Sequence, residues 1–212
     1  MVASFGRSVG PISTLPEGVS KLLRADAIFS TAPGDGAKLY FYPHHFRDFS
    51  GSTHNVYYHS KASEIAQALL GALGLPDASY LALRAEAETF RCGRCPPAAA
   101  MRMGWKQLIQ HYIDSIRLWE RISQAPRTES NNEYVYICTH DINSDKAGRP
   151  LAHLGGNPTG RSPWYTSTCI PCERLGLNAS ESRQCQQAMA DHLRDAHLIE
   201  VPESGGVYRY HY

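Results

Sequence analysis

Two Cys-x-x-Cys pairs carry the most specific chemistry in this sequence of 212 residues: Cys92-Gly-Arg-Cys95 and Cys169-Ile-Pro-Cys172. A gap of two residues lets both thiolates of a tight turn face one tetrahedral ion, at the ~2.3 Å sulfur distance that zinc prefers. A thioredoxin-like redox centre would need a preceding strand–helix–strand unit, which the Gly- and Pro-rich stretch 143–163 does not supply. The pairs therefore predict metal binding.

Two histidines complete a ligand set behind the second pair. Nineteen residues separate Cys172 from His192, and four more separate His192 from His197. Histidines with this spacing at the end of a helix can reach one ion once the last turn loosens, although the middle segment is longer than in the usual DNA-binding finger. The sequence predicts one zinc ion bound by Cys169, Cys172, His192 and His197.

The first pair leaves its ligand set open. Fifteen residues separate Cys95 from His111, which lies on a predicted helix, and no histidine follows at the next turn. The fourth ligand could be His140, Cys138, Asp114, His44 or His45, and a further arrangement pools the two cysteine pairs into one four-cysteine site. We favour a second, separate zinc ion, with the candidate ligands Cys92, Cys95, His111 and His140.

The remaining polar residues near these pairs have ordinary explanations. Cys138 and Cys185 are expected to be small core thiols. His153 is assigned no role. Arg91, Arg94 and Arg102 surround the first pair and could bind phosphate, but we expect a solvated cluster.

Hydrophobic periodicity places these ligands on an α+β framework that is mainly helical, with short strands. Apolar residues recur at helical spacing over 60–73 and 104–122, and a final helix is predicted over 181–197. The aromatic and β-branched segments 39–42, 55–58 and 134–138 predict strands. The fold class is therefore α+β with two zinc-knuckle–helix units.

The predicted organisation has three parts. Residues 1–16 form a flexible arm, and residues 17–125 form a helical domain with the first knuckle. Residues 133–212 form a strand, a long loop and a C-terminal Cys2His2-like zinc unit, after a polar linker.

Composition excludes several classes of protein. Twenty-one basic and twenty acidic residues give a net charge of +1, which argues against a chain whose main task is to coat nucleic acid or an anionic membrane. No apolar run is long enough to span a bilayer, and no secretory signal is recognisable, so we expect an intracellular protein, cytoplasmic or nuclear. No phosphate loop, nucleophile elbow or zinc-deaminase signature appears, so no enzyme is expected.

Six short motifs follow one another between about residue 15 and residue 212: Leu-Pro-Glu-Gly-Val-Ser-Lys-Leu-Leu (15–23), Tyr-His-Ser-Lys-Ala-Ser (58–63), Phe-Arg-Cys-Gly-Arg-Cys (90–95), Trp-Lys-Gln-Leu-Ile-Gln-His-Tyr (105–112), Thr-His-Asp-Ile (139–142) and His-Leu-Arg-Asp-Ala-His (192–197). Their order resembles the C-terminal region of F-box-annotated and uncharacterised zinc-finger-like proteins of mushroom-forming fungi. The resemblance implies that Cys92, Cys95 and His111 act together. Residues 15–19 resemble the opening of an F-box, but the helical Trp-Arg segment of that domain does not follow.

These observations predict a zinc-binding protein-interaction module with a protein partner, and the resemblance implies the substrate-recognition part of a ubiquitin-ligase adaptor. The alternative is a nucleic-acid-binding protein of the zinc-finger type. A DNA-reading finger needs base-contacting and phosphate-binding side chains at the start of its helix. The segment 178–184 carries one Arg and one Glu, which is weak for that function.

Overall fold

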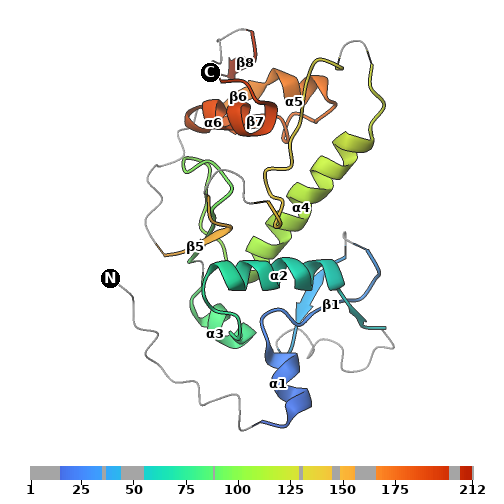
Figure 1. The fold of residues 1–212 in the computed structure, drawn as a ribbon, viewed down its shortest axis with the longest axis vertical. Helices are drawn as coiled ribbons and strands as arrows, with labels where there is room; N and C mark the ends of the chain where they lie inside the picture. The colour runs from blue at the N-terminus through green and yellow to red at the C-terminus, as the bar shows by residue number, and fades with distance from the viewer. Residues whose placement is uncertain are drawn as a thin grey trace. The chain divides into compact units, whose positions relative to one another are not determined.

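A computed structural model describes residues 15–34, 37–43, 55–87, 89–128, 131–144, 149–155, 166–200 and 206–211 (Figure 1). The chain divides into two compact units, Met1–Ala87 and Glu88–Tyr212. The sequence-based grouping placed the first cysteine pair with the helices of residues 17–125. In the structure that pair shares a unit with the second pair, because the strand that carries Cys92 pairs with a strand near residue 153.

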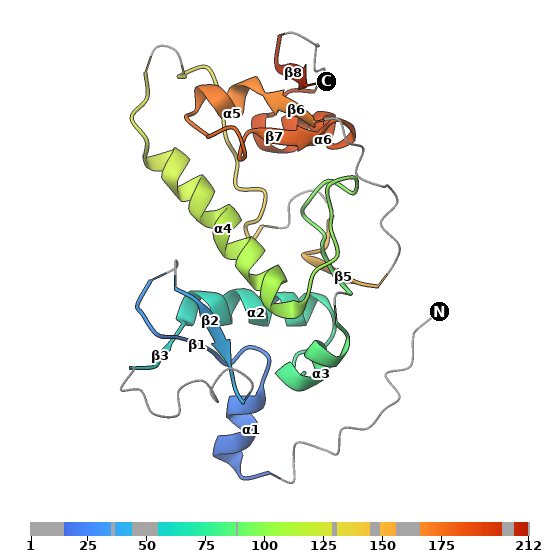
Figure 2. The ribbon, with the colours of Figure 1, turned by 180° about the vertical axis from the view of Figure 1, so that it is seen from behind.

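The first unit combines a small antiparallel sheet with helices. The sheet has the order β2-β1-β3, and α2 lies against β1 (Figure 2). The strands predicted over 39–42 and 55–58 are confirmed in shorter form. The elements of this unit are α1 (Glu17–Leu23), β1 (Ile28–Ser30), β2 (Leu39–Phe41), β3 (Tyr57–Tyr58), α2 (Ser60–Ala72) and α3 (Tyr80–Ala85).

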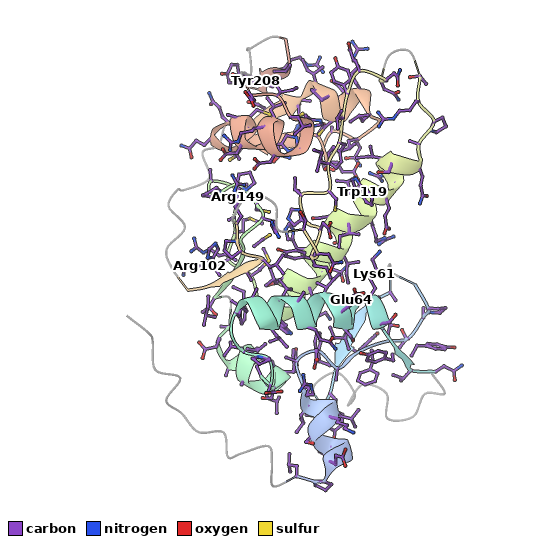
Figure 3. The ribbon with its side chains drawn as sticks, in the orientation of Figure 1. Lys61, Glu64, Arg102, Trp119, Arg149 and Tyr208 are labelled. Atoms are coloured by element: carbon purple, nitrogen blue, oxygen red, sulfur yellow. The ribbon has the colours of Figure 1, made fainter. Side chains whose placement is uncertain are left out.

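Helix α2 forms where the apolar periodicity predicts it. Ile65 and Leu69 are buried on one face, while Lys61 and Glu64 project from the helix (Figure 3). His59 caps the helix, because its side chain accepts the N–H of Ala62 at 3.3 Å.

Helix α3 begins at Tyr80, directly after Ser79. The hydroxyl of Ser79 accepts the N–H of Ala82 at 3.2 Å, which satisfies one of the free amides of the first turn. The helix therefore begins at the side chain that can cap it.

The second unit contains a two-stranded and a three-stranded antiparallel sheet. The first pairs β4 with β5, and the second has the order β7-β6-β8. The short elements α5, β6, β7, α6 and β8 gather in one part of this unit (Figures 1 and 2). Its elements are β4 (Phe90–Cys92), α4 (Trp105–Gln124), β5 (Ala152–Leu154), β6 (Thr166–Cys169), α5 (Ile170–Arg174), β7 (Arg183–Cys185), α6 (Gln186–His197) and β8 (Tyr208–His211).

Helix α4 confirms the helix predicted over 104–122. Its first turn is closed by Gln107, whose side-chain oxygen accepts the N–H of Gly104 at 2.7 Å. Trp105 is buried and its ring lies edge-on to Phe90 of β4, with 5.5 Å between the centroids. The apolar stripe of the helix thus holds the β4–β5 pair in place.

The strand predicted over 134–138 is wrong. This segment is extended but joins no sheet, because its backbone bonds to the end of α6 instead. The N–H of Ile137 donates to the carbonyl of Ala196 at 2.9 Å, and the carbonyl of Val135 accepts from the His197 ring at 2.6 Å. Val135 is exposed and the other residues of the segment are half-buried, so the segment lies against the end of a helix and is not covered on both sides.

The start of the final helix is also wrong. Helix α6 begins at Gln186, and the residues before it form strand β7. Thr166 of β6 pairs with Cys185, so the backbone of 183–185 bonds across a sheet and not along a helix. A turn built on Asn178, whose side chain accepts the N–H groups of Ser180 and Glu181, precedes the strand.

The described parts of the chain include no helix long and apolar enough to cross a membrane. The α+β class with two knuckle–helix units is confirmed by the short sheets, the helices and the two Cys/His clusters described next.

Candidate metal centres

The second cysteine pair meets two histidines of α6. Cys169 ends β6 and Cys172 lies in the first turn of α5, where Pro171 suits the start of a helix. The Nε2 atom of His197 lies 3.4 Å from Cys169 Sγ and 3.2 Å from Cys172 Sγ. The Nε2 atom of His192 lies 3.2 Å from Cys172 Sγ. Four potential ligand atoms therefore converge, all within 4.8 Å of one another.

A backbone carbonyl orients the ring of His197 from the side that faces away from the cysteines. Its Nδ1 lies 2.6 Å from the carbonyl oxygen of Val135, and a carbonyl can only accept. Nδ1 must therefore carry a proton, and in the neutral ring the Nε2 lone pair then faces the two sulfur atoms. Histidines that ligate metals typically donate their other N–H in this way.

The first cysteine pair meets one histidine from a helix and one from a turn. Cys92 ends β4, Cys95 follows the knuckle, and His111 lies on α4. Cys95 Sγ lies 3.3 Å from His111 Nε2 and 3.5 Å from His140 Nε2, and these two nitrogen atoms are 2.9 Å apart. The four ligand atoms again lie within 4.8 Å of one another.

Neighbouring groups orient this first cluster as well. Nδ1 of His140 and the hydroxyl oxygen of Thr139 lie 2.9 Å apart, within hydrogen-bond distance. The hydroxyl of Tyr112 lies 3.6 Å from Cys92 Sγ and donates to the carbonyl of Leu151 at 2.6 Å. The hydrogen bond from Tyr112 to Leu151 joins α4 to the segment that leads into β5, which is the strand paired with β4.

The sulfur–nitrogen distances in both clusters are close to the edges of a zinc tetrahedron. With bonds of ~2.3 Å to sulfur and ~2.0 Å to nitrogen, sulfur and nitrogen ligands should lie about 3.5 Å apart. The five sulfur–nitrogen distances given above run from 3.2 to 3.5 Å. The donor set and its geometry fit a tetrahedral cation.

The two thiols of each pair differ in acidity. A hydrogen bond from Cys95 lowers the pKa of Cys92, against the opposing effect of burial and with help from the cluster histidines. The pKa of Cys95 is raised because it donates that bond and because it is buried. In the second pair the pKa of Cys169 is lowered and that of Cys172 is raised, for the same reasons. Each pair thus readily loses one proton, and a cation would displace the second.

The second cluster lies inside a hydrophobic core. Cys169 and Cys172 are fully buried, and Ile122 from α4 reaches the same core. The aromatic ring of Tyr136 lies edge-on to His197 at 5.5 Å between centroids. The remaining buried members of this core are Leu175, Leu177, Met189 and Leu193. Water is therefore largely excluded from this ligand set.

The structure brings all eight predicted ligand residues into two separate groups of four. The two cysteine pairs do not share one site. Cys138 and Asp114 are outside the first group, and Asp114 accepts instead from Gln110 at 3.0 Å. Cys185 is also outside, with its Sγ 3.7 Å from the carbonyl of Ala98. His44 and His45 lie outside the described residues.

Sequence reasoning did not identify the groups that orient the histidines. Thr139 lies beside His140 in the sequence, so a Thr-His dipeptide was a local signal that could have been used. The carbonyl of Val135 is 62 residues away from His197 and has no side-chain signature.

A cavity of about 220 Å³ lies between the two clusters. Cys95 and His111 line it from the first cluster, and His192 lines it from the second. The half-buried aromatic residues Trp119 and Tyr136 contribute apolar surface, and Figure 3 shows Trp119 on α4. Ligand residues of both candidate metal centres therefore line the same partly apolar cavity.

Comparison of the chain with models of protein families, with curated proteins and with solved structures finds no match.

Proposed function

We propose that the chain is a zinc-binding protein-interaction module that holds one structural Zn²⁺ in each cluster. The observation that carries the proposal is the convergence of two thiols and two imidazole Nε2 atoms in each of two groups, with the distances of a tetrahedron.

The donor set favours zinc over other common cations. Calcium and magnesium take oxygen ligands, and the clusters offer only sulfur and nitrogen. Thiolates with imidazoles in tetrahedral geometry suit zinc. Two thiolates also balance the charge of Zn²⁺, so that a buried centre would be neutral.

The role of the ions is structural in this proposal. A catalytic zinc ion keeps one position open for water or substrate, whereas each cluster supplies four protein ligands. The second cluster is also enclosed by apolar side chains. We therefore propose no enzymatic activity.

The cavity between the clusters supports an interaction role. Its apolar lining from Trp119, Leu118 and Tyr136 suits a side chain of a partner protein. The resemblance to fungal F-box-annotated proteins extends the proposal to substrate recognition in a ubiquitin-ligase adaptor. All six cysteines are free thiols, which suits a reducing compartment such as the cytoplasm or nucleus.

Metal analysis tests the proposal directly. Plasma emission spectrometry on the purified protein should give two zinc ions per chain, and zinc X-ray absorption should give an average of two sulfur and two nitrogen neighbours. A protein that is folded with no bound metal would overturn the proposal. The Cys185→Ser variant is the matched control, because it removes one thiol outside both clusters and should keep both ions.

A nucleic-acid reader of the zinc-finger type is the competing function. The first turn of α6 reads Gln186-Gln-Ala-Met189, in which Ala188 and Met189 are buried and no Lys or Arg is present, so this turn offers no basic side chain to a phosphate. We expect no specific duplex binding at physiological salt, where phosphate contacts alone are weak. A selection experiment that enriches one DNA site would favour this competing function.

A further inference from the structure

A second pocket, of about 330 Å³, lies beside the first cysteine pair and is basic. Arg91, Arg149 and His153 line it together with Gly93 and Pro150. Among the residues that the structure describes, no carboxylate side chain lines this pocket. Arg149 lies on the side of this unit that carries β5 (Figure 3).

The β4–β5 pair points its two basic side chains to the same face. Arg91 pairs directly with His153 across the two antiparallel strands, and residues opposite each other project from one face of a sheet. Phe90 and Cys92 alternate with Arg91, so they point to the other face and are buried against α4. Arg91 and His153 therefore share one face of this ribbon, and the pocket that they line also adjoins the first metal centre through Cys92 and Cys95.

Gly93 shapes the floor of the pocket. A Cβ atom at this position would lie 2.1 Å from the carbonyl oxygen of Pro150 and 3.3 Å from Nε2 of His153. Only glycine permits this close approach of the knuckle to the segment 149–153. The absence of a side chain at Gly93 leaves room beside His153 Nε2 in the lining of the pocket.

Some guanidinium N–H groups of Arg91 and Arg149 remain available for hydrogen bonds to a ligand. Nε of Arg91 is buried and has no hydrogen-bond partner within the described parts of the chain. Arg149 donates from one terminal nitrogen to Asp195 at 2.6 Å, which leaves other N–H groups of its guanidinium available. Buried donors normally have a partner, so an unmatched one beside a basic hollow indicates a missing anion.

We infer that this pocket binds a phosphate monoester, and that its source is a phosphorylated serine or threonine of a protein partner. Arginine recognises phosphate oxygens through paired N–H groups, and a monoester dianion matches two guanidinium groups. A nucleic-acid backbone would need an extended basic stripe, whereas this pocket is a single hollow on a chain of net charge +1. The choice of a protein source rests on the proposed interaction function.

The test uses the zinc-loaded protein after its metal content has been counted. The probes are inorganic phosphate, a short phosphoserine peptide flanked by Gly and Ala, and its unphosphorylated twin. The Nε–H signal of Arg91 in a proton–nitrogen NMR spectrum should move with the phosphopeptide and not with the twin. Arg91→Gln should weaken phosphopeptide binding by about tenfold or more, since a charge-assisted bond is lost.

Arg117→Gln provides the matched control, because Arg117 is an exposed arginine on α4 that does not line the pocket. This variant should bind the phosphopeptide like the parent protein. A folded, zinc-loaded parent protein whose Arg91 signal ignores the phosphopeptide would overturn the inference and leave the zinc proposal intact.

The probes also distinguish the sources of the phosphate. Tighter binding of the phosphopeptide than of inorganic phosphate supports a protein partner. Equal binding of the two, or displacement of the peptide by a lower concentration of single-stranded RNA, overturns the assignment to a protein. Loss of zinc from the parent protein would show instead that the proposed function itself is wrong.

Discussion

Chelation of the metal should unfold the second unit while the first unit keeps its hydrogen-bonded structure. All eight cluster residues lie in the unit Glu88–Tyr212, and none lies in the unit Met1–Ala87. The first unit has its own apolar core, in which Phe41 stacks on Tyr80 at 4.3 Å between ring centroids. Metal removal should therefore destabilise the second unit and leave the core of the first unit in place.

The expected magnitude follows from the position of the ligands. Cys169 and Cys172 belong to the buried core that also contains Leu193, so losing the ion breaks the core and the metal site together. A structural zinc ion contributes about 10–16 kcal/mol of apparent binding free energy in small fingers. The net stability of a typical domain is only about 5–15 kcal/mol. Chelation removes both ions, and the second unit is therefore expected to unfold.

Hydrogen exchange measures this effect at particular amides. The N–H of Cys169 donates to Ser182, and the N–H of Leu177 donates to Cys172. Loss of even ~4 kcal/mol would speed their exchange about a thousandfold, because each 1.4 kcal/mol corresponds to a factor of ten. The amide of Leu73, which donates to Leu69 at the end of α2, serves as the reference and should change little.

One result would refute this reasoning. If protection between Cys169 and His197 survives after metal analysis has shown complete removal, the ion does not hold that region together. A redox or catalytic role for the cysteine pairs would then have to be considered. Equal loss of protection in α2 would show that the first unit does not stand on its own core.

Two substitutions address the clusters one at a time. The double variant Cys169→Ser and Cys172→Ser should bind one zinc ion where the parent binds two, as measured by plasma emission. The control variant Cys185→Ser should retain both ions. An unchanged zinc content in the double variant would contradict the ligand assignment. Thr139→Val removes the hydroxyl beside His140 Nδ1 and should weaken the first site about 10–100-fold in a chelator competition, the usual effect of losing a group that orients a ligand. Unaltered affinity at that site would show that Thr139 does not orient the ring.

Features with a local cause could be predicted from the sequence. The helix α4 follows from apolar residues at steps of three and four, and from Gly104 and Gln107 at its start. The Cys-x-x-Cys spacing requires only a tight turn, so both knuckles were recognisable. His192 and His197 are five residues apart on one helix. The nineteen residues between Cys172 and His192 are enough for the chain to bring this helix back to the second cysteine pair.

The tertiary structure decided everything that depends on distant partners. Several residues could have supplied the fourth ligand of the first cluster, and His140 takes that place because the turn at 139–140 comes within 2.9 Å of His111 on α4. The segment 134–138 has the pattern of a strand, yet the end of α6 satisfies its backbone. Spacing specifies which residues can share a turn, but burial and backbone hydrogen bonding between remote segments select which of them meet.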